Sequence, residues 1–195
     1  MIRLALERDT EQIAGIYAPV VRDTAISFEV EPPTAAEMAR RLADSLPHFP
    51  WLVADHAGEI LGYVYAGTHR ARAAYRWSVD TTVYVHPRVH RAGVGRALYT
   101  SLLQVLAIQG FYTAYAGITL PNAGSVGLHE AVGFQPLGVY RGVGYKLGAW
   151  HDVGWWERAI SPRPPVPAPP LAMAAAQAAA AWHAALTSGA PWLRL

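Results

Sequence analysis

The chain contains no cysteine, and this absence removes several kinds of chemistry at once. Without thiols the protein has no disulfides, no thiolate metal ligands and no cysteine nucleophile. Charged residues are also sparse, at 15% of the 195 positions, and the formal net charge is only +2, with the arginines spread along the chain. Nucleic-acid-binding domains usually concentrate basic residues on one surface. The composition therefore gives little support to a nucleic-acid role.

Long apolar runs are missing as well. The first eleven residues mix charged and apolar side chains and offer no apolar core of signal-peptide length. The alanine-rich segment near the C-terminus carries Gln177 and His183 and few bulky side chains, which disfavours insertion into a membrane. We therefore expect a cytoplasmic protein without a membrane partner. Its 52% hydrophobic and 11% aromatic residues are typical of a folded globular domain.

Apolar spacing and capping residues predict an alternation of helices and strands. Asp9 with Gln12, and Thr34 with Glu37, have the spacing of helix capping boxes, and each pair precedes an apolar stripe. Further helices are predicted over 93–109 and 125–132, and strands over 51–54, 60–66, 79–86, 112–119, 135–140 and 152–157. This order predicts an α/β fold with a mixed sheet flanked by helices.

The composition divides the chain into three parts. Residues 1–160 contain all of these elements and are expected to form one domain. Six prolines in 161–170 disfavour helix and central strand, so this stretch is predicted to be a linker or an extended arm. The tail, 171–195, is rich in alanine and has few large side chains to bury, which predicts a partly helical segment that is loosely docked or disordered.

A basic loop with two glycines joins the 79–86 strand to the next helix. The first turn of a helix leaves backbone N–H groups unpaired and carries partial positive charge, which favours an anion. Gly93 and Gly95 would let a phosphate reach the backbone, and Arg91 and Arg96 would add charge-assisted hydrogen bonds. A solvated helix-capping loop would have the same sequence. A dinucleotide-binding turn is disfavoured because Leu98 replaces the required third glycine.

This loop resembles the acetyl-CoA-binding motif of the GNAT superfamily, usually written Gln/Arg-x-x-Gly-x-Gly/Ala, with His90 in the first position. A second segment, Leu120 to Phe134, resembles the pattern that follows it in that superfamily. The resemblance implies a sheet that is mostly antiparallel and splayed at the acetyl-CoA site. The cofactor-binding residues that it implies are Val83, Tyr84, Val85, Arg91, Ala92, Gly93, Val94, Gly95, Arg96, Asn122 and Ser125.

Three separated segments narrow the resemblance. Trp77 to Val85, Leu120 to Glu130 and Gly144 to Val153 are similar to segments of the phosphinothricin and methionine sulfoximine N-acetyltransferases, in the same order. The similarity runs from about residue 2 to 160 and leaves out the tail. It implies acetyl transfer from acetyl-CoA to the primary amine of a small amino-acid-like molecule, and a homodimer.

Two residues are candidates for catalysis. An amine must lose a proton before it attacks a thioester. The family has a glutamate where this chain has Asp80, whose shorter side chain is expected to act as the base, directly or through a water. A structural ion pair between Asp80 and a nearby arginine is the alternative. His129 replaces a common tyrosine and is expected near the sulfur, where it could protonate the thiolate.

Other parts of the site are expected to bind substrate. Arg70 and Arg72 match a Lys/Arg-x-Arg segment of the family and are candidate clamps for an anionic group. Phe28 and Tyr75 resemble residues that line the amino-acid pocket, although each could equally lie in the core or at the rim. The family's dimer interface lies near its sites, so three tryptophans are candidates for packing there or for burial in strands: Trp150, Trp155 and Trp156.

Two alternatives stay open. The same chemistry could act on another acceptor, such as a peptide N-terminus, a polyamine or an aminoglycoside, although Arg70 and Arg72 favour an anionic acceptor over a cationic one. The replacement of the family's glutamate by Asp80 also leaves room for a non-catalytic acyl-CoA sensor. A direct transfer needs no covalent enzyme intermediate, and no metal is expected.

Overall fold

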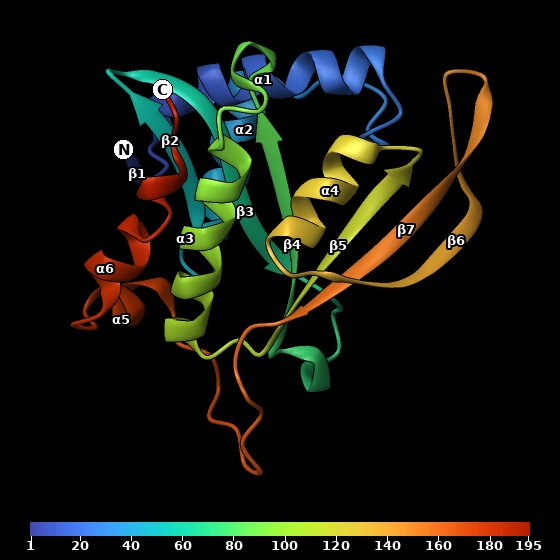
Figure 1. The fold of residues 1–195 in the computed structure, drawn as a ribbon. Helices are drawn as coiled ribbons and strands as arrows, with labels where there is room; N and C mark the ends of the chain where they lie inside the picture. The colour runs from blue at the N-terminus through green and yellow to red at the C-terminus, as the bar shows by residue number, and fades with distance from the viewer.

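The computed structural model describes all residues, 1–195. A seven-stranded sheet runs through its centre in the order β1-β2-β3-β4-β5-β7-β6 (Figure 1). The strands are β1 (Ile2–Leu4), β2 (Trp51–His56), β3 (Glu59–Thr68), β4 (Ser78–Val85), β5 (Thr113–Leu120), β6 (Gln135–Lys146) and β7 (Ala149–Ala159). Only β4 and β5 run parallel, and every other neighbouring pair is antiparallel. The mixed, mostly antiparallel sheet that was expected is confirmed.

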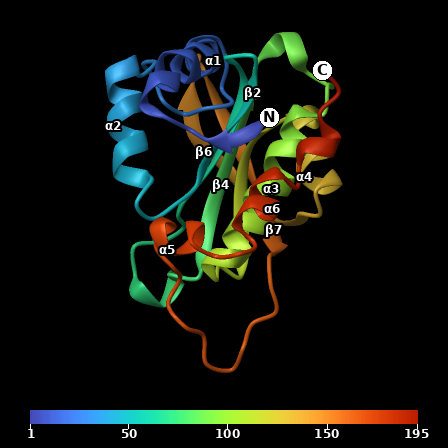
Figure 2. The same ribbon diagram turned by 90° about the vertical axis from the view of Figure 1, so that its left-hand side faces the viewer.

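Helices cover both faces of the sheet, as Figure 2 shows with the sheet nearly edge-on. Helices α1 (Thr10–Asp23) and α2 (Ala35–Ser45) lie on one face, and α3 (Val94–Gln109) and α4 (Ala123–Ala131) on the other. Each face has its own apolar core, a larger one beneath α3 and a smaller one beneath α1 and α2. None of the helices is both long and apolar enough to cross a membrane.

The predicted helix ends are only partly correct. Thr34 caps α2 as expected, because its Oγ1 accepts the Glu37 N–H at 3.1 Å, and Gly110 ends α3 with a positive φ of 87°. The capping box at Asp9 is wrong. The Asp9 carboxylate instead accepts two hydrogen bonds from the Arg3 guanidinium, and Gln12 hydrogen-bonds across to the turn between β2 and β3.

Two parts of the sheet extend beyond the sequence prediction. The first is β1, which the sequence analysis did not predict. The second is the β6–β7 hairpin, whose strands continue well past the predicted 135–140 and 152–157. They meet at a tight turn in which Leu147 and Gly148 have φ angles of 52° and 78°. Turns with two left-handed residues match the twist of paired strands, so the hairpin can run long and narrow.

The C-terminal tail packs more closely than its composition predicts. Its helices α5 (Met173–Gln177) and α6 (Trp182–Thr187) are followed by a 3-10 turn, and α6 lies along α3 on the side away from α4 (Figure 1). Met173 is fully buried. Gly189 lies so close to α3 that a Cβ there would be 1.8 Å from the Ala97 carbonyl oxygen. Small residues thus let two backbones meet without bulky side chains.

Candidate active site

The central feature of the site is a cleft where β4 and β5 separate. The two strands pair over three positions only, ending at Asp80 opposite Tyr115, and then diverge (Figure 1). A narrow cavity of about 50 Å³ lies between them. It is lined by Ile26, Thr81, Thr82, Val83, Tyr84, Gly117, Ile118, Thr119, Asn122, Ser125 and His129. Beyond Asp80, the edge of β4 that faces β5 has no strand to pair with, so its backbone groups can bond to an extended ligand.

Next to the cleft, the start of α3 presents a row of free amides. The N–H groups of Gly93, Val94, Gly95 and Arg96 donate no hydrogen bond within the protein. Gly93 is the N-cap, with a φ of 80°, and no side chain caps this end of the 16-residue helix. Free amides at the positive end of a helix dipole bind phosphate groups. The geometry therefore fits a ligand with a phosphate at this point and an extended arm in the cleft.

His129 lies on the α3 side of the cleft and is bonded at both ring nitrogens. Its Nδ1 is 2.7 Å from the Ser125 carbonyl oxygen, which can only accept, so Nδ1 carries the proton. Its Nε2 accepts the hydroxyl of Tyr99 at 2.8 Å. Burial favours the neutral form of both groups: it lowers the pKa of His129 and raises the pKa of Tyr99. The arrangement is a neutral imidazole that fixes a neutral phenol.

Asp80 lies on the opposite side of the cleft and has a different partner from those expected. Its Oδ1 is 2.6 Å from His69 Nδ1, whereas it forms no ion pair with Arg70, Arg72 or Arg76. Desolvation raises the pKa of Asp80, and the hydrogen bond from His69 partly opposes this effect. The structural alternative of an arginine pair is therefore wrong, and the carboxylate belongs to a His–Asp pair.

Aromatic side chains surround this His–Asp pair. The His69 ring stacks on Tyr115 with centroids 4.2 Å apart and has edge contacts with Tyr75 and Trp155. The Arg70 guanidinium carbon lies 5.9 Å from the Trp155 ring centroid. The indole N–H of Trp155 is buried and has no partner in the protein. A buried donor without a partner is costly, and a ligand oxygen would satisfy it.

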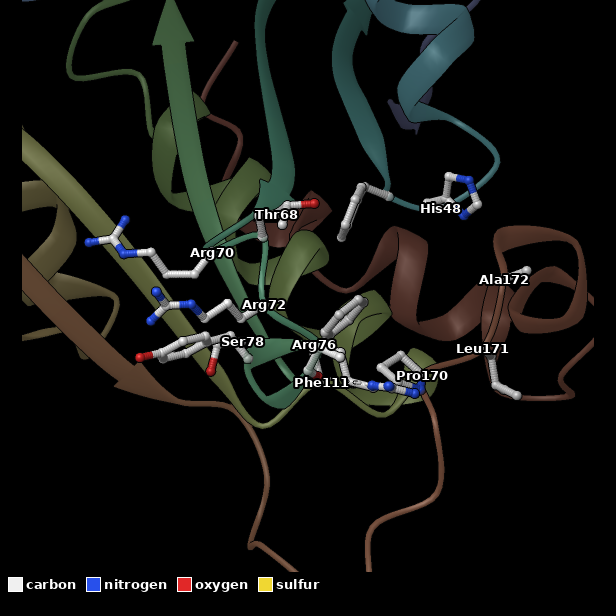
Figure 3. Close-up of a pocket in the computed structure, with 14 residues that line it drawn as sticks. His48, Thr68, Arg70, Arg72, Arg76, Ser78, Phe111, Pro170, Leu171 and Ala172 are labelled. Carbon is white, nitrogen blue, oxygen red and sulfur yellow. Dashed lines mark hydrogen bonds between the residues drawn. The ribbon is translucent and has the colours of Figure 1, made fainter.

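The loop between β3 and β4 also forms a larger pocket of about 400 Å³, shown in Figure 3. Arg70, Arg72 and Tyr75 contribute to its lining. Arg70 and Arg72 extend to the same side, while His48 and Leu171 lie at the opposite end. Three of the four predicted substrate residues are thus brought together.

The fourth predicted substrate residue, Phe28, lies elsewhere. It packs against Gly144 of the β6–β7 hairpin so closely that a Cβ there would be 2.1 Å from its ring, and it has a looser contact with His151. Phe28 therefore lies between the α1–α2 connection and the hairpin, outside the pocket that Arg70, Arg72 and Tyr75 line.

Comparison with known proteins identifies the family to which this fold belongs. Residues 2–155 match the acetyltransferase (GNAT) domain family. The chain belongs to the GNAT acetyltransferases. A phosphinothricin acetyltransferase from Sinorhizobium meliloti, whose crystal structure contains acetyl-CoA, superposes with a TM-score of 0.78 at 34% identity, covering 82% of this chain and 87% of that one. The expected superfamily is therefore confirmed.

Two curated relatives narrow the family further. Phosphinothricin N-acetyltransferase from Streptomyces viridochromogenes is 43% identical over 171 residues, which cover 87% of this chain and 93% of that protein. An L-methionine sulfoximine/L-methionine sulfone acetyltransferase from Pseudomonas paraeruginosa is 35% identical, covering 83% and 95%. The resemblance to these two groups of GNAT enzymes is confirmed.

Within this GNAT site, the predicted cofactor residues have distinct positions. Val83 and Tyr84 line the cleft, whereas Val85 lies beyond it, with its carbonyl oxygen 3.1 Å from His90 Nε2. Asn122 caps α4 through its Oδ1, which accepts the Ser125 N–H at 3.1 Å. Its side chain therefore shapes the cleft wall by fixing the start of that helix.

The arginines near the free amides are arranged unequally. Arg91 is exposed and adopts a positive φ of 68°, next to the glycine N-cap. Arg96 lies over the tail residue Trp192, with its guanidinium carbon 3.3 Å from the ring centroid. A guanidinium that stacks on an aromatic face keeps its N–H edges available for a phosphate. The tail thus reaches the free amides at the start of α3.

Sequence reasoning missed three residues of this site: His69, Tyr99 and Tyr115. His69 follows the end of β3 and reaches Asp80 only because Gly67 pairs with Asp80 across the two strands. Tyr99 lies within the helix predicted over 93–109, but nothing in the sequence indicates that its hydroxyl meets His129 on another helix. The His69–Asp80 contact could be found only from the register of β3 and β4, and the Tyr99–His129 contact only from the packing of α3 and α4.

Proposed function

We propose that the protein transfers the acetyl group of acetyl-CoA to the primary amine of a small amino-acid-like molecule of the phosphinothricin or methionine sulfoximine type. The observation that carries the proposal is the position of the cleft. It joins the free amides at the start of α3 to the last paired position of β4, where Asp80 is found. Acetyl-CoA laid along this path would bring its thioester close to a carboxylate.

The cofactor is proposed to bind through backbone groups for most of its length. Its pyrophosphate would accept hydrogen bonds from the amides of Gly93 to Arg96, with added charge from Arg91. Its pantetheine arm would extend the sheet along Val83 and Tyr84. A backbone N–H of this free edge would then stabilise the oxyanion that forms as the amine attacks.

The two sides of the cleft are proposed to handle different protons. The amine approaches on the side of Asp80, which assists removal of the amine proton. The thiolate leaves on the side of His129 and Tyr99 and is then protonated. Because acetyl passes directly from sulfur to nitrogen, no step calls for a metal or a covalent enzyme intermediate.

The substrate is proposed to carry an anionic group beside its amine. Arg70 and Arg72 extend together from the β3–β4 loop and carry no ion pair within the protein. Paired guanidinium groups suit a carboxylate or phosphinate and repel a cationic acceptor. This charge favours amino-acid-like amines over polyamines and aminoglycosides.

We further propose that the protein is a cytoplasmic homodimer. The β6–β7 hairpin exposes large apolar side chains, including Tyr145 (62% exposed), Leu147 (63%) and Trp150 (69%). Contiguous exposed apolar side chains of this kind mark interfaces. Trp156, in contrast, is buried in the core beneath α3. Sedimentation of Trp150→Arg against wild type tests this proposal, which predicts monomers for the variant.

Calorimetry with acetyl-CoA and a thiol-release assay together test the function. We expect acetyl-CoA to bind, and thiol release to depend on phosphinothricin or methionine sulfoximine. Turnover only with a peptide N-terminus, a polyamine or an aminoglycoside would replace the proposed acceptor. Binding without turnover of any amine would indicate an acyl-CoA sensor, and no binding would refute the proposal.

A further inference from the structure

His69 is the one ionisable side chain in hydrogen-bonding contact with Asp80. Its Nδ1 is 2.6 Å from Asp80 Oδ1. An ionised carboxylate only accepts hydrogen bonds, so Nδ1 carries the proton and the lone pair of a neutral ring is on Nε2. Nε2 makes no hydrogen bond with the protein. The ring is held by its stack on Tyr115, and 13% of its side chain is exposed.

The place of this pair in the sheet puts it at the closed end of the cleft. Asp80 and Tyr115 form the last paired position of β4 and β5, and His69 lies against both side chains. The cleft begins at the next residue of β4, Thr81. A thioester that reaches the end of the cleft would therefore meet the His–Asp pair.

We infer that His69 is the general base of this protein, taking the amine proton on Nε2 while Asp80 orients the ring and stabilises its charged form. This inference rests on the proposed acetyl transfer and names the residue that touches the amine. The imidazole extends the reach of Asp80, whose side chain is one methylene shorter than the glutamate of related enzymes.

Proton affinity also favours the imidazole. Free amines have pKa values of ~8 to 10, imidazole near ~6.5 and carboxylates near ~4, so imidazole is the closer match to the proton that must move. A carboxylate behind a histidine fixes the tautomer and stabilises the imidazolium that forms, as in catalytic triads. His69 and Asp80 have the geometry of this arrangement.

In the proposed transfer, His69 Nε2 takes two protons from the substrate nitrogen in turn. The substrate ammonium gives one proton to His69 Nε2, which passes it to solvent. The neutral amine then attacks the thioester carbon, the N–C bond forms and the C–S bond breaks. A second proton leaves the nitrogen through Nε2 and is taken up by the thiolate. The products are the amide, the CoA thiol and one proton released to solvent.

Several charged or titratable groups face His69. Asp80 approaches from β4, Tyr115 from β5 and Tyr75 from the turn after β3, and Arg70 is its neighbour in the chain. Trp155 of β7 is uncharged. Burial raises the pKa of Tyr115, so this phenol stays neutral. Asp80 is thus the anion that stabilises a protonated His69.

The test compares wild type with His69→Phe, which keeps an aromatic ring on Tyr115, and with His69→Ala, which leaves room for free imidazole. His56→Phe, at an exposed histidine on β2, is the matched control. Calorimetry first establishes that each variant binds CoA. Thiol release is then measured at saturating acetyl-CoA with an amine that wild type acetylates.

We expect His69→Phe to lower kcat by about 10²–10⁴-fold, with acetyl-CoA affinity unchanged and His56→Phe like wild type. Added imidazole should restore the kcat of His69→Ala in proportion to the concentration of neutral imidazole. If His69→Phe keeps the kcat of wild type, or if His69→Ala loses activity that imidazole does not restore, His69 is not the base. If wild type acetylates no amine, the proposed function itself has failed.

Discussion

Two histidines flank the cleft, and they are held in opposite ways. His129, on the α3 side, is bonded at both nitrogens by Ser125 and Tyr99 and is buried. His69, on the other side, is bonded at one nitrogen by Asp80, and its second nitrogen has no partner in the protein. A ring bonded at both nitrogens can only position its neighbours, whereas a ring with a free nitrogen can accept a proton. The side of the cleft that we propose receives the amine is therefore the one equipped for proton removal.

The largest effect should come from Asp80→Ala, which removes the partner of the free-nitrogen histidine. Without the carboxylate, the His69 tautomer is not fixed and its charged form is not stabilised. We expect kcat to fall by about 10²–10⁴-fold while the KM for acetyl-CoA stays near that of wild type. Steady-state thiol release measures both constants. A rise in KM with kcat intact would instead place Asp80 on the cofactor side of the cleft.

The next largest effect should come from Gly93→Ala, on the phosphate side. A Cβ there would lie 2.0 Å from the Trp192 carbonyl oxygen, in a residue whose φ is 80°. Both the clash and the left-handed backbone oppose a side chain, at a cost of about 1–3 kcal/mol. We expect weaker acetyl-CoA binding and a lower melting temperature, measured by calorimetry and thermal unfolding. Gly148→Ala, at the left-handed hairpin turn far from the cofactor, is the control for backbone strain alone.

A pH-dependent loss of stability should follow from His129. Burial lowers its folded pKa from 6.5, so the unfolded chain binds the proton first as the pH falls. Its contribution to stability is present above pH 6.5 and is lost below it. Compared with wild type, His129→Gln should therefore show a shallower decline of the free energy of unfolding between neutral and mildly acidic pH. Urea unfolding at several pH values measures this slope, and equal slopes would contradict a buried neutral imidazole.

The smallest effect should come from Trp192→Ala in the tail. Removing this ring takes away the stack on Arg96, which is worth about 0.5–2 kcal/mol for a cation–π contact. We expect a slightly lower melting temperature and a modest loss of acetyl-CoA affinity, with kcat unchanged. Trp182→Ala, in the same tail but on α6, serves as the comparison by thermal unfolding and calorimetry. A loss of kcat would show that the tail acts on the chemistry and not only on the phosphate end.

The two sides of the cleft also differ in how far sequence could predict them. The phosphate side is local in the chain. Gly93, the free amides and the start of α3 lie within a few consecutive residues, so their spacing predicted either an anion site or a solvated capping loop. Asp80 was predicted because of its place in a recognisable strand segment. The cofactor side was therefore accessible to motif reasoning.

The amine side depends on contacts between distant segments. His69 and Asp80 meet through the register of β3 and β4, and Tyr115 joins them through the single parallel pairing of the sheet. No spacing in the chain encodes either contact. The strand β1 was missed for a different reason, since three residues carry too little pattern. The sequence analysis underestimated how closely the tail packs on α3. Close backbone packing at Gly189 requires small residues, whereas a composition rich in small residues predicts weak burial.

A crystal structure with acetyl-CoA and an unreactive amine analogue tests the proposed roles of the two sides of the cleft. We expect the pyrophosphate within hydrogen-bonding distance of the amides of Gly93 to Arg96, the thioester between β4 and β5, and the analogue facing His69 Nε2. A cofactor bound elsewhere, or an analogue on the His129 side of the cleft, would contradict the account.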